Sequence, residues 1–251
     1  MISGKGFKEY CKWNLCTRYE VRFEIDRVED GDYLFLNLDH FDPFVNYLNG
    51  VRFNKKINLV THNSDHDFTE EMFKRVEKYI VNVFPINSLI SGRGIKKIPI
   101  GIPDRSLDII TKIDIPTTKS KLVYLNFSVS THSDRKTCLD SLGSEDWVHK
   151  TSNWLDFFDF YKELSQFKYS ICPRGAGLDT HRVWESLYMG TIPIIKRSEL
   201  DDIYEKLPAL LIDDWEDITH ELLMEKYMDL KISLIKFKRE EWSRVDYWIS
   251  K

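Results

Sequence analysis

The segment from Lys168 to Ile195 contains the residues whose types and spacing point most clearly to chemistry. An apolar stretch runs into a loop, and Asp179 or Thr180 is placed to cap the helix that follows. The charged and glycine residues of this loop are Arg174, Gly175 and Gly177. Glycines let the backbone approach a ligand closely, and the amides and dipole at a helix N-terminus favour an anion such as a diphosphate. The pattern therefore indicates an anion site where a strand passes into a helix.

Arg182 and Glu185 follow at helical spacing and extend this pattern. Arg174 and Arg182 can add charge-assisted hydrogen bonds to phosphate oxygens. Glu185 lies one turn after Arg182 on the same helix face, where a carboxylate can accept both hydroxyls of a ribose. This arrangement would suit a nucleotide-sugar diphosphate. The alternative is a glycine turn with an ordinary surface ion pair, and the residue pattern favours neither interpretation.

The elements that must position these residues alternate between strand and helix. Short apolar runs predict strands at 33–38, 56–61, 81–84, 98–103, 122–127, 169–172, 191–195 and 210–212. Helical patterns begin at about Thr69 and recur at 132–138, 154–167, 180–189 and through most of 217–251. Gly190 fits the C′ position of the helix that carries Arg182.

Alternation of this kind predicts an α/β fold with parallel sheets and right-handed crossovers. A polar, proline-containing stretch at 111–120 indicates a linker between two small Rossmann-like, doubly wound domains that face a central cleft. We place the first domain at 1–115 and the second at 116–235. A C-terminal helix at 236–251 is expected to pack back on the first domain. Ligands should bind at the carboxyl ends of the strands.

Composition excludes several classes of protein. The 251 residues have 42% hydrophobic and 30% charged side chains, which rules out a disordered or low-complexity chain. A formal net charge of −4 argues against a broad nucleic-acid-binding surface. The four cysteines match no zinc pattern, and their number favours a reducing compartment. No signal peptide or membrane-spanning run is evident, so we expect a cytoplasmic protein.

The segment 168–215 resembles the signature of exostosin-like glycosyltransferases, close to glycosyltransferase family 47. The shared features are Cys-Pro-Arg-Gly at 172–175, Asp-Thr-His-Arg at 179–182, Trp-Glu-Ser-Leu at 184–187, Met-Gly-Thr-Ile-Pro-Ile at 189–194 and Leu-Pro-Ala-Leu-Leu-Ile-Asp-Asp-Trp at 207–215. Weaker similarity covers 59–65, 98–102, 125–128 and Arg135. The resemblance is therefore strong only in the C-terminal half. The chain resembles the small soluble enzymes of this family, of bacterial or large-DNA-virus type.

This resemblance implies a GT-B fold and an inverting, metal-independent glycosyl transfer without any cofactor beyond the UDP-sugar donor. The second domain would bind the nucleotide-sugar, and the first would bind an oligosaccharide or glycoprotein acceptor. Arg135 and Arg182 would face the diphosphate, helped by amides near Gly175 and Gly177. Glu185 would bind the ribose. The residue that shapes the loop or touches the donor sugar would be Asp179 or Arg174. The chain is short for this fold, which implies minimal loops.

An inverting transfer needs a base that deprotonates the acceptor hydroxyl. Polar residues after the strand at 56–61 lie where such a base is expected, and we favour Asp65, with His62 or His66 as rivals. A second polar group after the strand at 33–38 comprises Asp39, His40 and Asp42. The alternative is a plain turn in which Asp67 caps the next helix.

The donor and the role of the aromatic residues stay open at this level. UDP-xylose is the first expectation, followed by UDP-galactose, UDP-glucose and UDP-glucuronate, and a GDP-sugar is an alternative. The aromatic residues that can stack on a base or sugar are Trp154, Phe157, Trp184 and Trp215, although helical spacing favours core positions for Trp154 and Phe157. A non-catalytic partner subunit that binds nucleotide-sugar or glycan is the second functional hypothesis.

Overall fold

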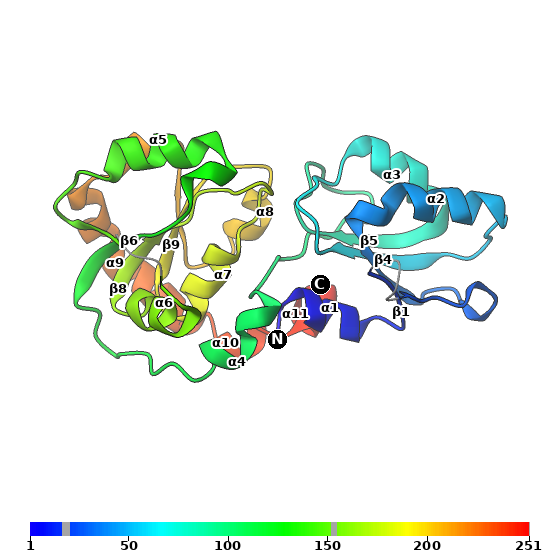
Figure 1. The fold of residues 1–251 in the computed structure, drawn as a ribbon, viewed down its shortest axis with the longest axis horizontal. Coiled ribbons are helices and arrows are strands. Elements are labelled where there is room, and N and C mark those ends of the chain that lie inside the picture. Colours follow the sequence, from blue (N-terminus) through cyan, green and yellow to red (C-terminus); the bar gives the residue numbers. More distant parts are fainter. Residues whose placement is uncertain (17–20, 152–154, 251) are drawn as a thin grey trace. The chain divides into compact units, whose positions relative to one another are not determined.

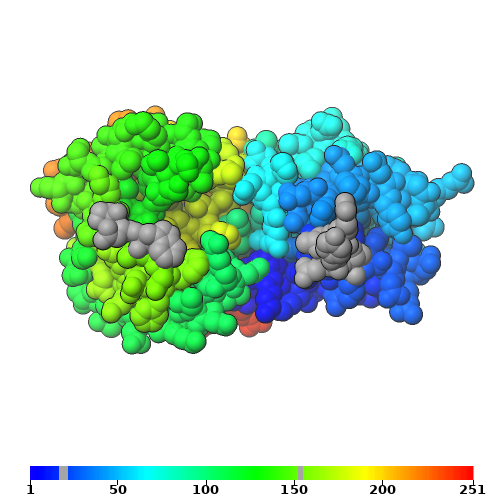
Figure 2. Space-filling model, viewed as in Figure 1, coloured from blue at the N-terminus to red at the C-terminus, as the bar shows by residue number. Residues whose placement is uncertain are grey.

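Two α/β units make up the protein in this computed structural model. The first comprises Met1–Ile100 and Ser243–Lys251, and the second comprises Gly101–Trp242. The structure describes residues 1–16, 21–151 and 155–250; the other residues are grey in Figures 1 and 2. The expected fold class, α/β with two Rossmann-like units, is confirmed.

The first unit is built on a five-stranded sheet in the order β2-β1-β3-β4-β5. Its strands are β1 (Trp13–Leu15), β2 (Val21–Arg22), β3 (Tyr33–Asn37), β4 (Ile57–His62) and β5 (Ile80–Pro85). Its helices are α1 (Gly4–Tyr10), α2 (Phe41–Gly50), α3 (Glu70–Val76) and α11 (Val245–Ile249), and short 3-10 turns are Ile25–Arg27, Leu38–His40 and Glu77–Tyr79. All neighbours pair in parallel except β1 with β2. Every residue of β4 is buried, including the polar Asn58, Thr61 and His62, as suits a central strand of a parallel sheet.

The second unit has an entirely parallel sheet in the order β10-β9-β8-β6-β7. Its strands are β6 (Lys121–Leu125), β7 (Val148–Lys150), β8 (Phe167–Ile171), β9 (Ile192–Lys196) and β10 (Leu210–Ile212). Its helices are α4 (Leu107–Ile110), α5 (Ser133–Leu142), α6 (Phe157–Leu164), α7 (His181–Tyr188), α8 (Asp201–Tyr204), α9 (His220–Lys236) and α10 (Arg239–Trp242), with 3-10 turns at Asp104–Ser106, Val129–Thr131 and Trp215–Asp217. Helices lie on both sides of β6, β8 and β9 (Figure 1). The chain order reverses between β6 and β8, which makes this point the topological switch of the sheet.

The prediction of a strand at 98–103 is wrong. Ile98 and Ile102 are buried, but the segment between them forms no strand. Pro99 and Pro103 lack the N–H groups that a paired strand needs, so the apolar residues pack as an irregular segment. The apolar residues of 98–103 therefore indicate a buried segment and not a paired strand.

The division between the units falls earlier than the linker expected at 111–120. Residues from Gly101 onward belong to the second unit, where the Ser106 Oγ lies 2.7 Å from the hydroxyl of Tyr161. At the other end, Ser243–Lys251 groups with the first unit, and the backbone N–H of Ile2 donates to the carbonyl of Ser243 at 2.7 Å. The expected C-terminal segment at 236–251 is thus divided after Trp242.

Lys119 connects the segment before β6 to the ends of two helices. Its Nζ donates to the carbonyls of Ser165 and Met189, at 2.5 and 2.7 Å, and these residues are the C-caps of α6 and α7. Gly190, in the left-handed region at φ +66°, follows α7 as expected for C′. The ammonium therefore meets the negative ends of two helix dipoles.

Burial lowers the pKa of Lys119 from 10.5 to about 7, which makes the stability of the fold pH-dependent. The unfolded chain binds this proton more tightly, so the free energy of unfolding should rise as pH increases from about 7 toward 10.5. Between pH 7 and about 8.5 we expect a gain of about 1–2 kcal/mol, measured by urea denaturation. Lys119→Met should lack this gain. An identical pH response in both proteins would contradict the prediction.

Candidate functional site

A cavity of about 600 Å³ lies at the topological switch point of the second unit. Asn126, which directly follows β6, and Ile171, the last residue of β8, both line it. Open parallel sheets bind ligands beyond the carboxyl ends of their strands, at the point where the strand order reverses. The topology therefore places a ligand site here independently of any motif.

Arg182 and Glu185 enter this cavity from the first turns of α7. Arg182 Nε lies 3.4 Å from Glu185 Oε2, and a second guanidinium nitrogen donates to the carbonyl of Asn126. The Arg182 guanidinium also stacks over the Phe160 ring, 4.4 Å from its centroid. The two charged side chains are only 18% and 6% exposed, so the interpretation as a surface ion pair does not hold.

Arg135 reaches the same cavity from the first turn of α5. Its Nε donates to the carbonyl of Arg174 at 2.8 Å, and NH1 donates to the carbonyl of Ser128 at 3.0 Å. Burial and then the charge of Arg182 lower the pKa of Arg135, which shows that the two guanidinium groups repel each other. A Cβ at position 175 would lie 3.1 Å from Arg135, so Gly175 leaves the room that this arginine occupies.

The cavity carries an excess of positive charge. Arg105, Arg135 and Arg182 all line it, whereas Glu185 is the only acidic side chain that does so among the described residues. The first turn of α7 lies in the wall of this cavity, where its backbone N–H groups form the positive end of the helix dipole. An anion such as a diphosphate would relieve the repulsion between the two central arginines.

Glu185 is held in place by a buried tyrosine. The hydroxyl of Tyr161 donates to Glu185 Oε1 at 2.7 Å and lies equally close to Ser106 Oγ, which itself donates to the carbonyl of Pro103. Burial and the negative charge of Glu185 raise the pKa of Tyr161, so the phenol stays a donor at every ordinary pH. This support orients the carboxylate in the cavity wall, and its remaining lone pairs can accept hydroxyls from a ligand.

Arg174 does not join Arg182, contrary to the sequence-based expectation. Its guanidinium donates to the carbonyl of Ala176, and its side chain lines a neighbouring cavity of about 590 Å³ together with Lys196 and Arg197. The Arg174 side chain folds against its own loop after β8, because it bonds the backbone of that loop two residues further on. Arg135, and not Arg174, lies beside Arg182 in the cavity. Gly177, which lies in the loop after β8 with Arg174, is buried.

Asp179 shapes this loop and lies away from solvent, at 4% exposure. Its two carboxylate oxygens accept from the indole N–H of Trp184 at 2.9 Å, and one of them accepts from the hydroxyl of Tyr204 at 2.9 Å. The N-cap of α7 is Thr180, whose side chain makes no capping bond. Of the two roles expected for Asp179, the geometry supports loop shaping.

Removing this carboxylate should destabilise the second unit. Asp179→Ala leaves two buried donors without their acceptor, and we expect a loss of about 2–4 kcal/mol in the free energy of unfolding. Asp213→Ala is a suitable control because the Asp213 side chain is 85% exposed, and surface changes usually stay within about 0.5 kcal/mol. Denaturation with urea measures both. Equal stabilities of the two variants would refute this role of Asp179.

The expected base candidates lie after β4 in the first unit. Asp65 and His66 are exposed, and His66 Nε2 lies 3.8 Å from Asp39 Oδ1. Ser64 Oγ donates to the same oxygen at 2.5 Å and accepts from the backbone N–H of His66 at 3.1 Å. Asp39 and Ser64 therefore hold His66 at the carboxyl ends of β3 and β4. Asp42 is instead paired with Arg75 at 2.6 Å.

His62 is not placed with them. It ends β4 with 1% exposure, between the rings of Phe7 and Phe35, and its Nδ1 lies 2.8 Å from Asn63 Oδ1. A base must reach the acceptor hydroxyl. The burial of His62 therefore supports a structural role, and Asp65 and His66 stay as the candidates.

The aromatic candidates divide between core and cavity. Trp184 and Trp215 are fully buried, with indole N–H groups bonded to Asp179 and Asp134, so neither can stack on a ligand. Phe157, expected in the core, is half-buried and lines the cavity. Trp154 lies outside the described residues.

Several residues of the site were missed by sequence reasoning. Arg105 lines the cavity, although its segment is expected in the first domain, and buried Ser106 and Tyr161 support Glu185. Spacing along one helix can reveal Arg182 with Glu185, but the contact between Tyr161 and Glu185 depends on packing between α6 and α7.

Two other histidines near the site, His132 and His181, and the thiol of Cys172 have structural contacts. His132 Nδ1 accepts from the N–H of Asp134 at the start of α5, and His181 Nδ1 lies 2.6 Å from the carbonyl of Gly101. Burial raises the pKa of the Cys172 thiol to about 12, as expected for an unreactive core thiol. Within residues 1–16, 21–151 and 155–250, no three His, Cys, Asp or Glu side chains gather in a way that could hold a metal ion. Over the same part of the chain, the helices are too short or too polar to span a bilayer.

Comparison with known proteins gives structural likeness only. No protein-family model and no curated protein matches the sequence. Among solved structures, one described as trehalose-6-phosphate from E. coli bound with UDP-2-fluoro glucose is 10% identical, with a TM-score of 0.49, over 90% of this chain and 74% of the other. An α,α-trehalose-phosphate synthase (UDP-forming) from Burkholderia vietnamiensis is 8% identical, with a TM-score of 0.48, over 90% and 75%. At these values the likeness supports no statement about the reaction of this chain.

Proposed function

We propose that the protein is an inverting glycosyltransferase of the GT-B type that transfers a sugar from a UDP-sugar to a hydroxyl of a glycan. The observation that carries the proposal is the convergence of Arg135 and Arg182 on one cavity at the switch point, with Glu185 as its single acidic side chain among the described residues. Two guanidinium groups and a helix N-terminus suit a diphosphate that gains charge as it leaves.

In this proposal the acceptor oxygen attacks the anomeric carbon from the side opposite to UDP. The carbon–oxygen bond to the β-phosphate breaks, its electron pair leaves with UDP, and the anomeric configuration inverts. Asp65, or His66 as its rival, takes the proton of the acceptor hydroxyl. Arg135 and Arg182 balance the charge of the departing UDP, so no metal is required.

Glu185 is assigned to the ribose hydroxyls of the donor. Its position is fixed by Tyr161 on one oxygen and by Arg182 on the other. The backbone near Gly175 and Gly177 is assigned to the phosphates, because glycine permits close approach. The donor sugar is proposed to be xylose first, with galactose, glucose and glucuronate as the alternatives to be assayed.

We further propose membership of the exostosin-like family, an oligosaccharide or glycoprotein acceptor, and a cytoplasmic location. The family rests on the motif at 168–215 alone. The location rests on the thiols, since Cys11, Cys138 and Cys172 are free and buried.

The test is the consumption of UDP-sugars by the purified protein with EDTA present. Release of UDP from one sugar, with inversion at the anomeric carbon seen by proton NMR of the product, is the expected result. Consumption that requires a metal, or retention of configuration, would contradict the mechanism. Binding of UDP without turnover of any donor on a panel of glycan acceptors would favour a non-catalytic partner subunit.

A further inference from the structure

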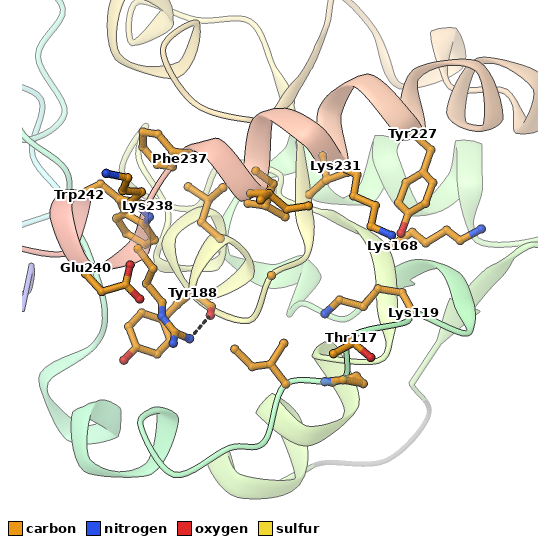
Figure 3. Close-up of a pocket in the computed structure, with 18 residues that line it drawn as sticks. Thr117, Lys119, Lys168, Tyr188, Tyr227, Lys231, Phe237, Lys238, Glu240 and Trp242 are labelled. Atoms are coloured by element: carbon orange, nitrogen blue, oxygen red, sulfur yellow. Dashed lines mark hydrogen bonds between the residues drawn. The ribbon is translucent and has the colours of Figure 1, made fainter.

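A third cavity, of about 360 Å³, opens near the amino ends of strands of the same sheet (Figure 3). Lys168 and Ile192, near the starts of β8 and β9, line it, whereas the cavity of Arg135, Arg182 and Glu185, the donor cavity, begins where β6 and β8 end. The third cavity and the donor cavity share no lining residue. The proposed glycosyl transfer does not use the third cavity.

The charges that line the cavity are unbalanced. Its fully charged basic residues are Lys168, Lys231, Lys238 and Arg239, against the single acid Glu240 among the described residues. Lys119 also lines it, but burial lowers its pKa to about 7. Lys238 is paired with Glu241 at 3.0 Å. Neither Lys168 nor Lys231 forms an ion pair with any carboxylate of the described part of the chain. Two lysines therefore lack a counter-charge.

These two lysines converge on one aromatic ring. The Nζ atoms of Lys168 and Lys231 lie 4.7 and 5.9 Å from the centroid of Tyr227. Figure 3 shows both side chains with the Tyr227 hydroxyl at one end of the cavity, with Lys119 nearby. Neither ammonium has a counter-charge among the residues that the structure describes, and an anion lying between the two would supply it. The Tyr227 hydroxyl is an additional donor at this position.

The rest of the wall is apolar. Leu187, Leu234 and Trp242 line the cavity beside these charges, and Ile235 lies at its edge with 71% exposure. Further exposed apolar side chains continue from Ile235 along α9, namely Ile232, Met228 and Met224. The volume lies in the range of small-molecule sites, which combine an apolar wall with a few convergent polar groups.

We propose that this cavity binds a phosphate ester with an apolar or aromatic body, the phosphate lying between Lys168 and Lys231 and the body against Leu234 and Ile235. A soluble organic phosphate and the phosphate of a lipid share this chemistry. The apolar row on α9 would contact the acyl region if the source is a lipid.

The test uses phenyl phosphate as the soluble probe and benzyl alcohol as its uncharged counterpart, titrated calorimetrically into the whole protein. Phenyl phosphate should bind, and Lys168→Gln/Lys231→Gln should weaken its affinity by about tenfold or more, because each lysine supplies a charge-assisted bond. Lys226→Gln is the matched control, since this α9 lysine is outside the cavity and paired with Glu225 at 2.8 Å. Affinity for UDP should be the same in all variants, which separates this site from the donor cavity.

A second arm identifies the source. Sedimentation with phosphatidylcholine vesicles that contain phosphatidic acid, but not with phosphatidylcholine alone, would assign the site to a lipid phosphate if Ile232→Glu/Ile235→Glu abolishes it. Binding of phenyl phosphate without vesicle binding would assign it to a soluble ester. The proposal is overturned if neither probe binds, or if the double lysine variant binds both as tightly as the wild type.

Discussion

Replacing Arg182 by alanine should lower the rate of sugar transfer by about 10²–10³-fold, the loss that follows removal of one donor from a site of developing negative charge. In the free protein this guanidinium is already fixed by Glu185, the Asn126 carbonyl and the Phe160 ring. It therefore meets the leaving diphosphate without reorganisation. Affinity for UDP should fall by about tenfold or more, because UDP retains the charge that Arg182 contacts.

Arg182→Lys and Arg197→Ala make this result specific. The lysine keeps the charge but loses the planar fork, so its rate should lie between those of the wild type and the alanine variant. Arg197 lies outside the cavity in a surface cluster with Asp201 and Glu205, and its loss should leave transfer unchanged. Thermal unfolding checks that all three variants fold. Transfer by Arg182→Ala at the wild-type rate would remove this residue from the mechanism.

Replacing Asp65 by asparagine should lower the rate of transfer by about 10²–10⁴-fold, the usual contribution of a general base, and leave affinity for UDP unchanged. The asparagine has nearly the same shape but cannot take the proton of the acceptor hydroxyl. Asp65 is exposed after β4, as a group that meets an acceptor must be. Steady-state rates with saturating donor, together with UDP titrations, measure both quantities.

His66→Gln and Asp26→Asn decide between the base and its rival. If Asp65 is the base, His66→Gln should retain most of the activity, and the exposed Asp26 should be dispensable. The reverse result, a large loss with His66→Gln alone, would move the role to the histidine that Asp39 and Ser64 hold. Full activity in both Asp65→Asn and His66→Gln would leave the proposal without a base in this group.

The fold could be predicted largely because nearly all strand pairs are parallel and the central strands are buried. Strands such as β4 and β9 appear as short apolar runs, and the glycine after α7 marks the end of that helix by its positive φ. The strands β1 and β7 were missed because three residues are too few to show a period. The helix α2 was also missed, although its buried Phe41, Phe44, Val45 and Leu48 follow helical spacing. At 98–103, which contains two prolines, the error is the opposite one: a strand is predicted where none forms.

The candidate site could be predicted where its residues lie on one element. Arg182 and Glu185 share a helix face, so spacing alone placed them together. Arg174 turns away from the cavity to the carbonyl of Ala176 in its own loop, and Asp179 turns to Trp184 of α7 and Tyr204 of α8. The support of Glu185 by Tyr161 and Ser106 joins residues far apart in the chain, and no local pattern encodes such packing.

Calorimetric titration of UDP into the wild-type protein, with EDTA and then with Mn²⁺, tests the donor site most directly. The proposal predicts binding that is equal in the two conditions, weaker for ADP, CMP and GDP, and largely lost in Arg182→Ala. No binding of any nucleotide at millimolar concentration, or binding that appears only with Mn²⁺, would contradict a metal-independent donor site built on Arg135 and Arg182.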